Sequence, residues 1–540
     1  MDNNINILKW YPFKENSRVL EIYKDDTILD KIGKNLDLDK QYIENLKLTG
    51  KYDYIVLIGS YEYAPTILNE EMPYSVFLKN LKEYLNEDGK ILIAIDNRLG
   101  IKYFAGAKSK YYSKVFQSIE NEIRQKKPNL LLKTELEKFI RQAGFENYKF
   151  YYPVPDYKNT NSIFTDEFLP KSNNSKILYP LSYEDGSMII FNETDVMKQI
   201  CDNNIFKNLT NSYFVEIGIK EIKNNIKFVN YNILRKDKYK LILTIDDKKV
   251  KKIPKSEETI DHIKNIKEYL TELQKLGFTT IETIENNEII SNFIDKKELD
   301  KIIVEQIEQE NIEKALDEIK RWYKYIENRL EKVENNNENL FKKLDIDVPI
   351  ELMEKMNFVK QGYIDLAFEN VFCDGDDYIF YDQEWKFENI PIEFILYRAI
   401  NNLYTYNSRK IENKIDKEEM YDKFKISEFT VYFEKLEKYV QNQILDEEKI
   451  KEYREKLKGY YRDIEQTEKI SANLLEENKK ISEENENILE ENRKILEKYE
   501  KIKIEKEEIQ ENNEKLLQQY NNSRAWKLIK RVRRFLGKEN

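Results

Sequence analysis

A strict seven-residue repeat of aliphatic side chains near the end of the chain constrains its folding more than any other feature. The repeat consists of Leu474, Ile481, Ile488, Ile495, Ile502, Ile509 and Leu516. Neither glycine nor proline occurs between Tyr460 and Arg534. Because a hydrophobic period of 3.5 residues winds helices into a left-handed supercoil, residues 446–522 are predicted to form a long α-helical coiled coil.

The partner of this helix is predicted from the residues three positions before the aliphatic ones. Asparagine stands at several of these positions, namely Asn478, Asn485, Asn492 and Asn513. Polar residues at such core positions lower stability but specify register and oligomer state, which favours a parallel homo-oligomer. The alternative is a single charged helix rich in glutamate and lysine.

The last residues, 523–540, are predicted to form a basic amphipathic helix. Its apolar face holds Ala525, Leu528, Ile529, Val532, Phe535 and Leu536, with Trp526 beside them. Lysine and arginine fill the other face, so that residues 521–540 carry seven basic side chains against one acidic side chain. This pattern is typical of a helix lying in the interface of an anionic membrane, and a partner-binding helix is the alternative.

Composition excludes several other classes of protein. The formal net charge is −10 despite the basic end, so nucleic acid is not expected as a partner. Two cysteines and one histidine exclude a disulfide framework, a multi-cysteine zinc site and a serine–histidine triad. No apolar run approaches the roughly 20 residues of a membrane span, and the start lacks a basic signal-peptide head. We therefore expect a cytoplasmic protein, peripheral on the inner membrane face.

Residues 1–214 are predicted to form an α/β domain. Short aliphatic runs at 18–22, 53–59 and 90–96 are typical of buried strands, and residues 74–85 have helical spacing. Strands that alternate with helices imply a mostly parallel sheet.

Several stretches of this domain resemble class I S-adenosylmethionine (SAM)-dependent methyltransferases. They are residues 19–22, 52–59, 97–106 and 151–157, and the two longer loop stretches are similar to a bacterial branch from cell-surface polysaccharide loci. The resemblance implies a Rossmann-like fold, with Glu21 and Asp53 as cofactor-binding residues.

The chain departs from that family where the cofactor would bind. A glycine-rich turn follows the first strand in the family, because the backbone must approach the cofactor closely. Here Tyr23, Asp25 and Thr27 occupy those places. The short segment before Ile55 leaves little room for a second strand, although Asp37 or Asp39 could supply the ribose-binding acid. We expect SAM to bind weakly or not at all.

Residues 215–445 are predicted to form a two-lobed α+β domain of the kinase type. Strands expected at 227–231, 239–245 and 249–253 precede a helix at 257–276. This order suits a small lobe whose strand lysine neutralises phosphate charge. Lys252 or Lys251 would be that lysine, with Glu258 or Glu268 as its ion-pair partner. The alternative is a lysine-rich hairpin at a solvated edge.

A pair of loops further along carries the stronger signal. Asp365 and Asn370 lie in a loop before a short strand, and the next strand leads to Asp382. This frame resembles the catalytic and metal-binding loops of aminoglycoside and choline kinases. The resemblance implies Mg-ATP as cofactor, Asp365 as catalytic base, Asn370 and Asp382 as metal ligands, and Glu384 as an auxiliary acid.

Two departures from those kinases leave alternatives open. Tyr363 stands where they commonly have histidine, and no glycine-rich phosphate loop is evident. A kinase fold without activity and an unrelated hairpin element with surface acids are the alternatives. His262, on the predicted helix, is expected to be packed or solvated rather than catalytic.

The order of the four parts resembles the layout of O-antigen chain-terminating methyltransferase/kinase proteins. It implies a transferase of bacterial cell-surface polysaccharide assembly that phosphorylates a hydroxyl of a surface glycan or lipid-linked oligosaccharide. An active SAM-dependent methyltransferase and a non-catalytic membrane-tethered scaffold for glycosyltransferases are the two alternatives.

Overall fold

The computed structural model describes most of the chain, in two compact units. The described residues are 5–67, 73–112, 114–120, 126–171, 190–191, 193–294, 296–334, 338–375, 377–451 and 464–537. The units are Met1–Tyr461 and Arg462–Asn540. Both predicted domains from 1 to 445 therefore lie in the first unit, and most of the predicted coil lies in the second.

Four parallel strands form the start of a large sheet. They are β1 (Arg18–Tyr23), β2 (Asp37–Tyr42), β3 (Tyr52–Ile58) and β4 (Leu85–Asp96), in the spatial order β2-β1-β3-β4. Aliphatic side chains of β1, β3 and β4 are buried on both faces, as strands covered on both sides require. The predicted strands at 18–22, 53–59 and 90–96 are thus present.

The short segment between β1 and β3 contains a second strand, although the sequence predicted little room for one. The crossover from β1 to β2 contains only the 3₁₀ turn η2 (Leu29–Lys31) where parallel strands usually have a helix. β2 then pairs with β1 in register, from Arg18 opposite Asp37 to Tyr23 opposite Tyr42. The expectation that little room remained for this strand was wrong, because it assumed a helical crossover.

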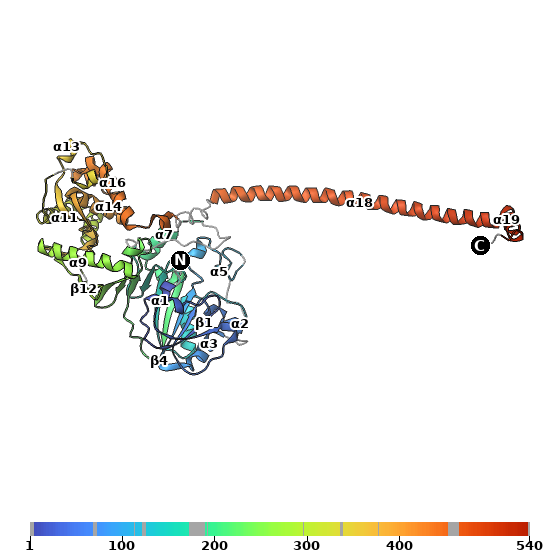
Figure 1. Cartoon of the computed structure of the whole chain (residues 1–540), viewed down its shortest axis with the longest axis horizontal. Coiled ribbons are helices and arrows are strands. Elements are labelled where there is room, and N and C mark those ends of the chain that lie inside the picture. The colour runs from blue at the N-terminus through green and yellow to red at the C-terminus, as the bar shows by residue number, and fades with distance from the viewer. Residues whose placement is uncertain are drawn as a thin grey trace. The chain divides into compact units, whose positions relative to one another are not determined.

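Helices cover both faces of this part of the sheet (Figure 1). α3 (Pro73–Lys82), α6 (Lys133–Gln142) and α7 (Glu193–Asp202) contribute buried side chains to one core. α1 (Asn6–Lys9) and the η2 turn contribute to a second core. The remaining short helices here are α2 (Ala64–Ile67), α4 (Ile101–Phe104), α5 (Gln117–Glu120) and α8 (Phe206–Leu209).

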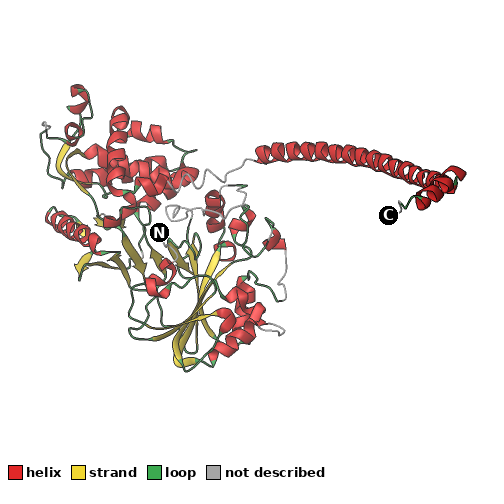
Figure 2. Ribbon diagram, turned by 45° about the vertical axis from the view of Figure 1, so that its right-hand side comes forward, coloured by secondary structure: helices red, strands yellow, loops and turns green. Residues whose placement is uncertain are grey.

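The sheet does not end where the first predicted domain ends. β7 (Ser212–Gly218) spans the predicted boundary at 214/215 and lies antiparallel between β4 and β5 (Asn147–Val154). β6 (Ser162–Thr165) then pairs with β8 (Phe228–Asn230), which joins the second predicted domain to the first. Among the described residues, one sheet of 12 strands therefore runs through both predicted domains. Figure 2 colours the strands of the chain yellow.

The far part of this sheet is antiparallel and carries one long helix. Beyond β8 follow β9 (Leu241–Ile245), β10 (Lys249–Pro254), β13 (Glu288–Asn292) and β12 (Thr283–Glu285). α9 (Ile260–Lys275) packs Ile263, Ile266 and Leu270 against Leu241 and Ile289. The strands and helix predicted between 227 and 276 are therefore all found.

A mainly helical subdomain completes the first unit (Figure 2). Its core joins α10 (Leu299–Glu308), α11 (Ile312–Glu327), α14 (Ile392–Ile411), α15 (Lys417–Lys423) and α16 (Thr430–Ile444). Two antiparallel strand pairs pack against these helices, β15 (Val371–Asp374) with β16 (Asp377–Phe380), and β14 (Phe358–Tyr363) with β17 (Lys386–Pro391). The short elements are β11 (Thr279–Thr280), α12 (Leu340–Lys343) and α13 (Ile350–Met353).

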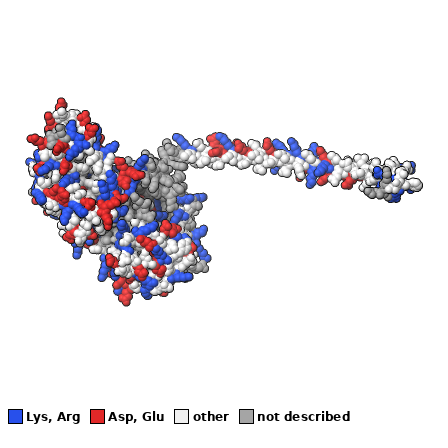
Figure 3. Space-filling model, viewed as in Figure 1, with Lys and Arg blue, Asp and Glu red and all other residues white. Residues whose placement is uncertain are grey.

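The described residues of the second unit, 464–537, form two helices. α18 (Ile464–Asn522) has 59 residues, and α19 (Arg524–Phe535) follows a cap in which the Ser523 hydroxyl accepts the Trp526 N–H. The aliphatic stripe of α18 is exposed, with Ile488 at 55% and Ile495 at 62%. Charges of both signs are interspersed along it (Figure 3). The predicted long helix is confirmed, whereas its oligomerisation stays a prediction.

No helix in the described ranges is both long enough and apolar enough to cross a membrane.

Candidate functional site

A buried lysine on β10 gathers carboxylates from distant parts of the first unit. Lys252 Nζ lies 3.0 Å from Glu282 Oε1 and 3.7 Å from Glu384 Oε1, and it also donates to Asp382 Oδ1. Burial alone would lower the pKa of Lys252, but the three carboxylates outweigh it and raise that pKa. Lys252 is therefore a permanent cation at this point, as a phosphate-binding lysine must be.

Asp382 reaches Lys252 from a strained backbone position. It follows β16, and its φ of +58° lies in the left-handed region that residues other than glycine seldom adopt. Its N–H donates to Glu282 Oε2 at 2.9 Å, which holds this conformation. Burial is the main reason why its pKa rises to about 6. Strain of this kind clusters at functional sites, where the surrounding structure maintains it.

Asp365 lies beside the same group of side chains. Its Oδ2 accepts the backbone N–H groups of Glu384 at 2.9 Å and Trp385 at 3.0 Å. Burial raises the pKa of Asp365 to about 7, with further contributions from the Asp382 and Glu384 charges against the opposing effect of Arg398. A carboxylate with a pKa near neutrality suits a proton acceptor. We call Glu282, Asp365, Asp382 and Glu384 the carboxylate centre.

Two amide side chains hold the loop of Asp365 in shape. Asn370 Nδ2 donates to the Asp365 carbonyl oxygen at 3.0 Å, and Gln383 Nε2 donates to the same oxygen at 2.8 Å. The Tyr381 N–H donates to the carbonyl of Asn370 at 3.1 Å. Asn370 is thus tied both to the Asp365 loop and to the segment that leads into Asp382.

Glu384 is the most strongly paired member of the carboxylate centre. Although burial acts to raise its pKa, the Arg235 guanidinium and His262 hold that pKa well below the ordinary value. Arg235 Nη1 donates to Glu384 Oε2, and His262 Nε2 lies 3.4 Å from the same oxygen. His262 is buried and its ring packs on Trp385 at 4.8 Å, so the expectation of a packed histidine fits.

The structure brings together most of the residues predicted for this site and corrects one pairing. Lys252 contacts Asp382 and Glu384, Asp365 accepts the Glu384 N–H, and Asn370 is bonded to the Asp365 carbonyl. The predicted partners Glu258 and Glu268 do not pair with Lys252, since Glu268 faces Lys386 at 3.7 Å instead. Lys251 is not in the cluster.

Sequence reasoning missed Glu282 and Arg235. Glu282 precedes β12, and Arg235 lies in the loop between β8 and β9. Neither residue belongs to a recognisable motif, because their roles depend on contacts with residues 100 or more positions away.

Tyr363 stands where the resembled kinases commonly have histidine, and it holds its loop through a different contact. Its hydroxyl donates to Glu272 Oε2 on α9 at 2.7 Å, and Lys386 Nζ lies 2.9 Å from the same oxygen. The loop before Asp365 is therefore tied to the helix of the antiparallel part.

Among the described residues, no three histidine, cysteine or acidic side chains are arranged as a ready metal site. The oxygens of Asp382 and Glu384 are bound to Lys252 and Arg235. Mg²⁺ commonly takes only one or two carboxylates plus phosphates and waters, so Asp382 with the Asn370 amide has the donor chemistry for it.

The second candidate site is the edge at which the parallel strands end. Glu21, near the end of β1, is buried, and its Oε1 accepts the N–H groups of Ile28 at 2.7 Å and Leu29 at 3.3 Å. Burial raises its pKa. The chain after β1 thus folds back onto the strand end, with Ile28 and Leu29 buried in the core.

The other acids predicted to contact a cofactor lie elsewhere. Asp53 is at the start of β3, where it accepts the Arg18 N–H at 2.9 Å and the Asn86 amide at 2.7 Å. Asp37 begins β2, and Asp39 accepts from the Tyr52 hydroxyl. All three therefore belong to the amino-terminal side of the strands, and their proposed cofactor contacts do not fit this position.

The edge at which β4 and β5 end is filled by a buried ion cluster. Lys102 Nζ lies 2.7 Å from Asp96 and 3.3 Å from Asp156, and Lys158 lies 3.8 Å from Asp96. Glu62, beside this cluster, is completely buried, and neither carboxylate oxygen has a hydrogen-bond partner in the described part of the chain. Burial raises its pKa to about 7.

The loop after β1 lacks the glycines that let the backbone of a SAM-binding turn approach its cofactor. Tyr23, Asp25 and Thr27 carry side chains where close approach needs bare backbone. Lys24 Nζ donates a hydrogen bond to the Tyr42 hydroxyl at 2.5 Å, and Asp25 forms an ion pair with Lys110 at 2.8 Å. The loop is thus occupied and tied down by its own side chains.

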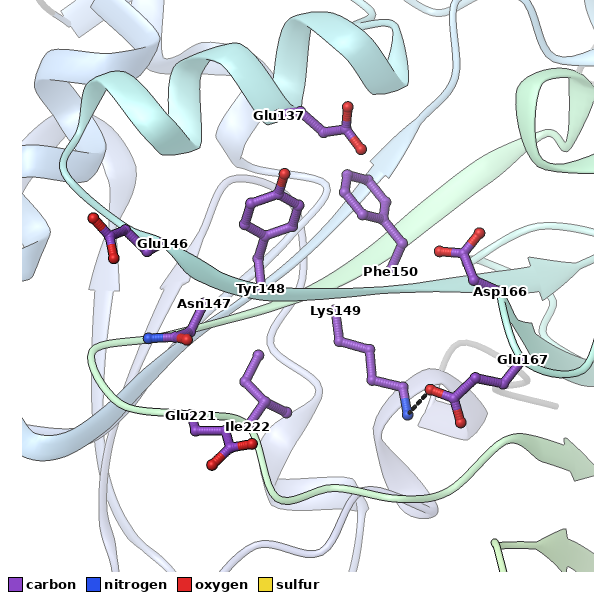
Figure 4. Close-up of a pocket in the computed structure, with 10 residues that line it drawn as sticks. All are labelled: Glu137, Glu146, Asn147, Tyr148, Lys149, Phe150, Asp166, Glu167, Glu221 and Ile222. Carbon is purple, nitrogen blue, oxygen red and sulfur yellow. Dashed lines mark ion pairs between the residues drawn. The ribbon is translucent and has the colours of Figure 1, made fainter.

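A pocket of about 410 Å³ lies away from both sites (Figure 4). It surrounds the start of β5, and its acidic lining residues are Glu137, Glu146, Asp166, Glu167 and Glu221. Lys149 crosses it and pairs with Glu167 at 3.5 Å. Acidic side chains on a surface hollow do not by themselves define a ligand, so no function is assigned to it.

No known protein family and no curated protein matches the chain. Solved structures with a similar fold include a SAM-dependent methyltransferase of Thermotoga maritima, described as a possible histamine N-methyltransferase, at 15% identity and a TM-score of 0.22 over 40% of this chain and 88% of that one. A SAM-dependent methyltransferase of Archaeoglobus fulgidus matches at 11% identity and 0.21, over 40% and 92%. Phosphoethanolamine N-methyltransferase 2 of Haemonchus contortus, in complex with SAM, matches at 14% and 0.23, over 41% and 52%.

These similarities say nothing about the activity of this chain. The N-terminal part has a class I methyltransferase-like fold, and its own strand arrangement describes that fold: β2-β1-β3-β4 parallel, with β7 inserted antiparallel before β5.

Proposed function

We propose that the chain is a phosphotransferase that moves the terminal phosphoryl group of ATP to a hydroxyl of a cell-surface glycan or lipid-linked oligosaccharide. The observation that carries the proposal is the contact of Lys252 with Asp382 beside Asp365. These residues come from three separate elements: Lys252 donates to Asp382, and the charge of Asp382 acts on Asp365.

The arrangement around this point supports the proposal. Kinases place the phosphate-binding lysine on the third strand of the small lobe, and Lys252 is on the third strand of the group β8-β9-β10. They separate the catalytic aspartate and the metal-binding asparagine by four residues, as Asp365 and Asn370 are separated here. The hairpin β15–β16 then leads to Asp382.

Each residue has a definite task in this reaction. Asp365 orients the acceptor hydroxyl and takes its proton as the new oxygen–phosphorus bond forms, while the bond between the terminal phosphorus and ADP breaks. Lys252 neutralises phosphate charge. Asp382 and Asn370 would hold Mg²⁺, which when bound offsets the charge of the transferred group.

The methyltransferase-like part is proposed to have a structural task. Its loop after β1 lacks the glycines of a SAM-binding turn, whereas its sheet continues through β6 and β8 into the strands that carry Lys252. We propose that it serves as the base of the small lobe.

The second unit is proposed to place the enzyme on its substrate. A parallel homo-oligomer of α18 would cover the exposed aliphatic stripe. The basic face of α19 would bind an anionic inner membrane, beside which lipid-linked acceptors are found. The exposed stripe and the cationic helix support this arrangement.

The first experiment measures Mg-ATP binding and ATP turnover by the full chain and by Asp365→Asn. We expect binding to persist in the variant, while turnover falls by about 100-fold or more because the proton acceptor is lost. Asp374→Asn, an exposed acid of β15, is the matched control and should keep full turnover. Absence of Mg-ATP binding by the wild-type chain would refute the kinase and favour the non-catalytic scaffold.

A further inference from the structure

The loop between β8 and β9 lies at the carboxylate centre and carries cations without any glycine. Residues 231–240 include Arg235, Lys236, Lys238 and Lys240. In kinases, a glycine-rich loop covers the nucleotide phosphates with backbone N–H groups. In this loop a side chain could take the place of those backbone N–H groups, because Arg235 points to Glu384 in the carboxylate centre.

The backbone of Arg235 is held from the helical subdomain. Arg235 forms an antiparallel bridge with Leu445, just beyond α16. On either side of it, the Lys236 N–H donates to the Ile444 carbonyl at 3.0 Å and the Asp446 N–H donates to the Leu234 carbonyl at 2.9 Å. The backbone of the loop is therefore fixed next to the carboxylate centre. A change in the hydrogen bonds of Arg235 requires only that its side chain rotates.

The guanidinium has unused hydrogen-bonding capacity. It carries five N–H donors, and within the described residues Glu384 is its one hydrogen-bond partner. Glu384, Asp382 and Asp365, in that order, are the acids that act on its charge. A planar fork of donors beside Asp382, the acid that would bind metal, matches the bidentate geometry of a phosphate group.

We propose that Arg235 binds the terminal phosphates of the nucleotide and so replaces the missing glycine-rich loop. This inference rests on the proposed function. In the nucleotide-free protein Arg235 neutralises Glu384, and with nucleotide bound its free donors face the phosphates. Lys252 and Arg235 then both neutralise the charge of the phosphates.

The test compares the binding of Mg-ATP, Mg-ADP and adenosine by the full chain and by Arg235→Ala. We expect ATP to bind about 10- to 100-fold more weakly to the variant, ADP to be affected less, and adenosine not at all, because charge-assisted bonds to phosphate are lost. Arg235→Lys keeps the charge against Glu384 but lacks the fork, so it should restore folding and only part of the ATP affinity. Lys238→Ala removes an exposed cation of the same loop and is the matched control.

Three outcomes would overturn the inference. Unchanged ATP affinity in Arg235→Ala and Arg235→Lys would show that Arg235 does not contact phosphate. An equal loss of affinity for all three ligands would show that Arg235 has a purely structural role. Tighter ATP binding by the variants would show that Arg235 obstructs nucleotide binding. If the wild-type chain binds no Mg-ATP, both the proposed function and this inference are wrong. If ATP affinity is unchanged in both variants, only the inference about Arg235 is wrong and the proposed function stands.

Discussion

The buried charged side chains Lys252, Glu384 and Glu62 differ in whether they have partners. Lys252 and Glu384 are each held by opposite charges. Glu62 in the methyltransferase-like part is completely buried without a hydrogen-bond partner in the described ranges. Since an unpaired buried carboxylate is costly in its charged form, Glu62 takes up a proton near neutral pH, whereas Glu384 stays ionised.

Glu62→Gln should change the pH dependence of stability. The pKa of Glu62 is about 7 in the folded protein, above its ordinary value of 4.5. The folded state therefore keeps the proton longer than the unfolded state, and this residue lowers the free energy of unfolding as the pH rises from about 4.5 to about 7. At pH 8 the variant should be more stable by up to about 3 kcal/mol, with a flatter profile.

Thermal unfolding of Glu62→Gln and wild type between pH 4 and 8 measures this difference. Glu83→Gln, an exposed glutamate of the same part, is the control and should follow the wild-type profile. Parallel profiles of Glu62→Gln and wild type across this range would show that Glu62 does not titrate as described.

At the scale of the element, the strand pair β14–β17 shows how closely the loop of Asp365 is supported. Gly362 lies in β14 two residues before Ile364, and a Cβ there would overlap the Cγ1 and Cδ1 atoms of Ile390. Ile390 is completely buried in β17, so its side chain has little room to move. The glycine is needed for this close packing and for the position of the loop that follows.

Gly362→Ala should therefore destabilise the protein by about 1–3 kcal/mol. Chemical denaturation of the single variants Gly362→Ala and Ile390→Val and of the double variant measures the coupling between the two positions. Ile390→Val removes one of the overlapping atoms, so the double variant should be more stable than the sum of the single effects predicts. Strict additivity would mean that the overlap is relieved elsewhere.

The helix α18 makes a second prediction at this scale. Replacing Ile488 and Ile495 by asparagine removes two apolar residues from the stripe and should convert an oligomer of the full chain into a monomer in light-scattering measurements. Glu483→Asn with Glu497→Asn alters other heptad positions and should leave the mass unchanged. A wild-type chain that is monomeric at all concentrations would contradict the coiled coil.

At the scale of the whole molecule, charge is divided between an acidic body and a basic end. The formal net charge is −10 although residues 521–540 contribute seven basic side chains. An anionic membrane would therefore repel most of the chain and attract α19 (Arg524–Phe535). Attraction of this type weakens with salt and falls with each cation removed.

Replacing Lys530, Arg531, Arg533 and Arg534 by glutamine should reduce binding to anionic vesicles. At about 1 kcal/mol for each cation, the affinity should fall by roughly three orders of magnitude at low salt. Sedimentation with phosphatidylserine-containing vesicles measures this, with neutral vesicles as the control. Equal binding of the wild type and the variant to anionic and neutral vesicles would argue that α19 binds a protein partner rather than a membrane.

The features that could be predicted from the sequence are those that depend on local periodicity and spacing. The heptads predicted α18, the aliphatic runs predicted β1, β3 and β4, and the separation of Asp365, Asn370 and Asp382 placed these three residues near one another. Such patterns are local, because helix and strand periods repeat every few residues.

Which distant residues are in contact became evident only from the folded structure. Glu282 rather than an acid of α9 pairs with Lys252, Arg235 reaches Glu384 across 149 positions, and Asp53 lies at the amino-terminal side of its strand rather than at a cofactor. The pairing of β6 with β8, which makes one sheet of two predicted domains, has no local signal either. These contacts depend on how packed layers bring chain segments together, and no period in the sequence records that.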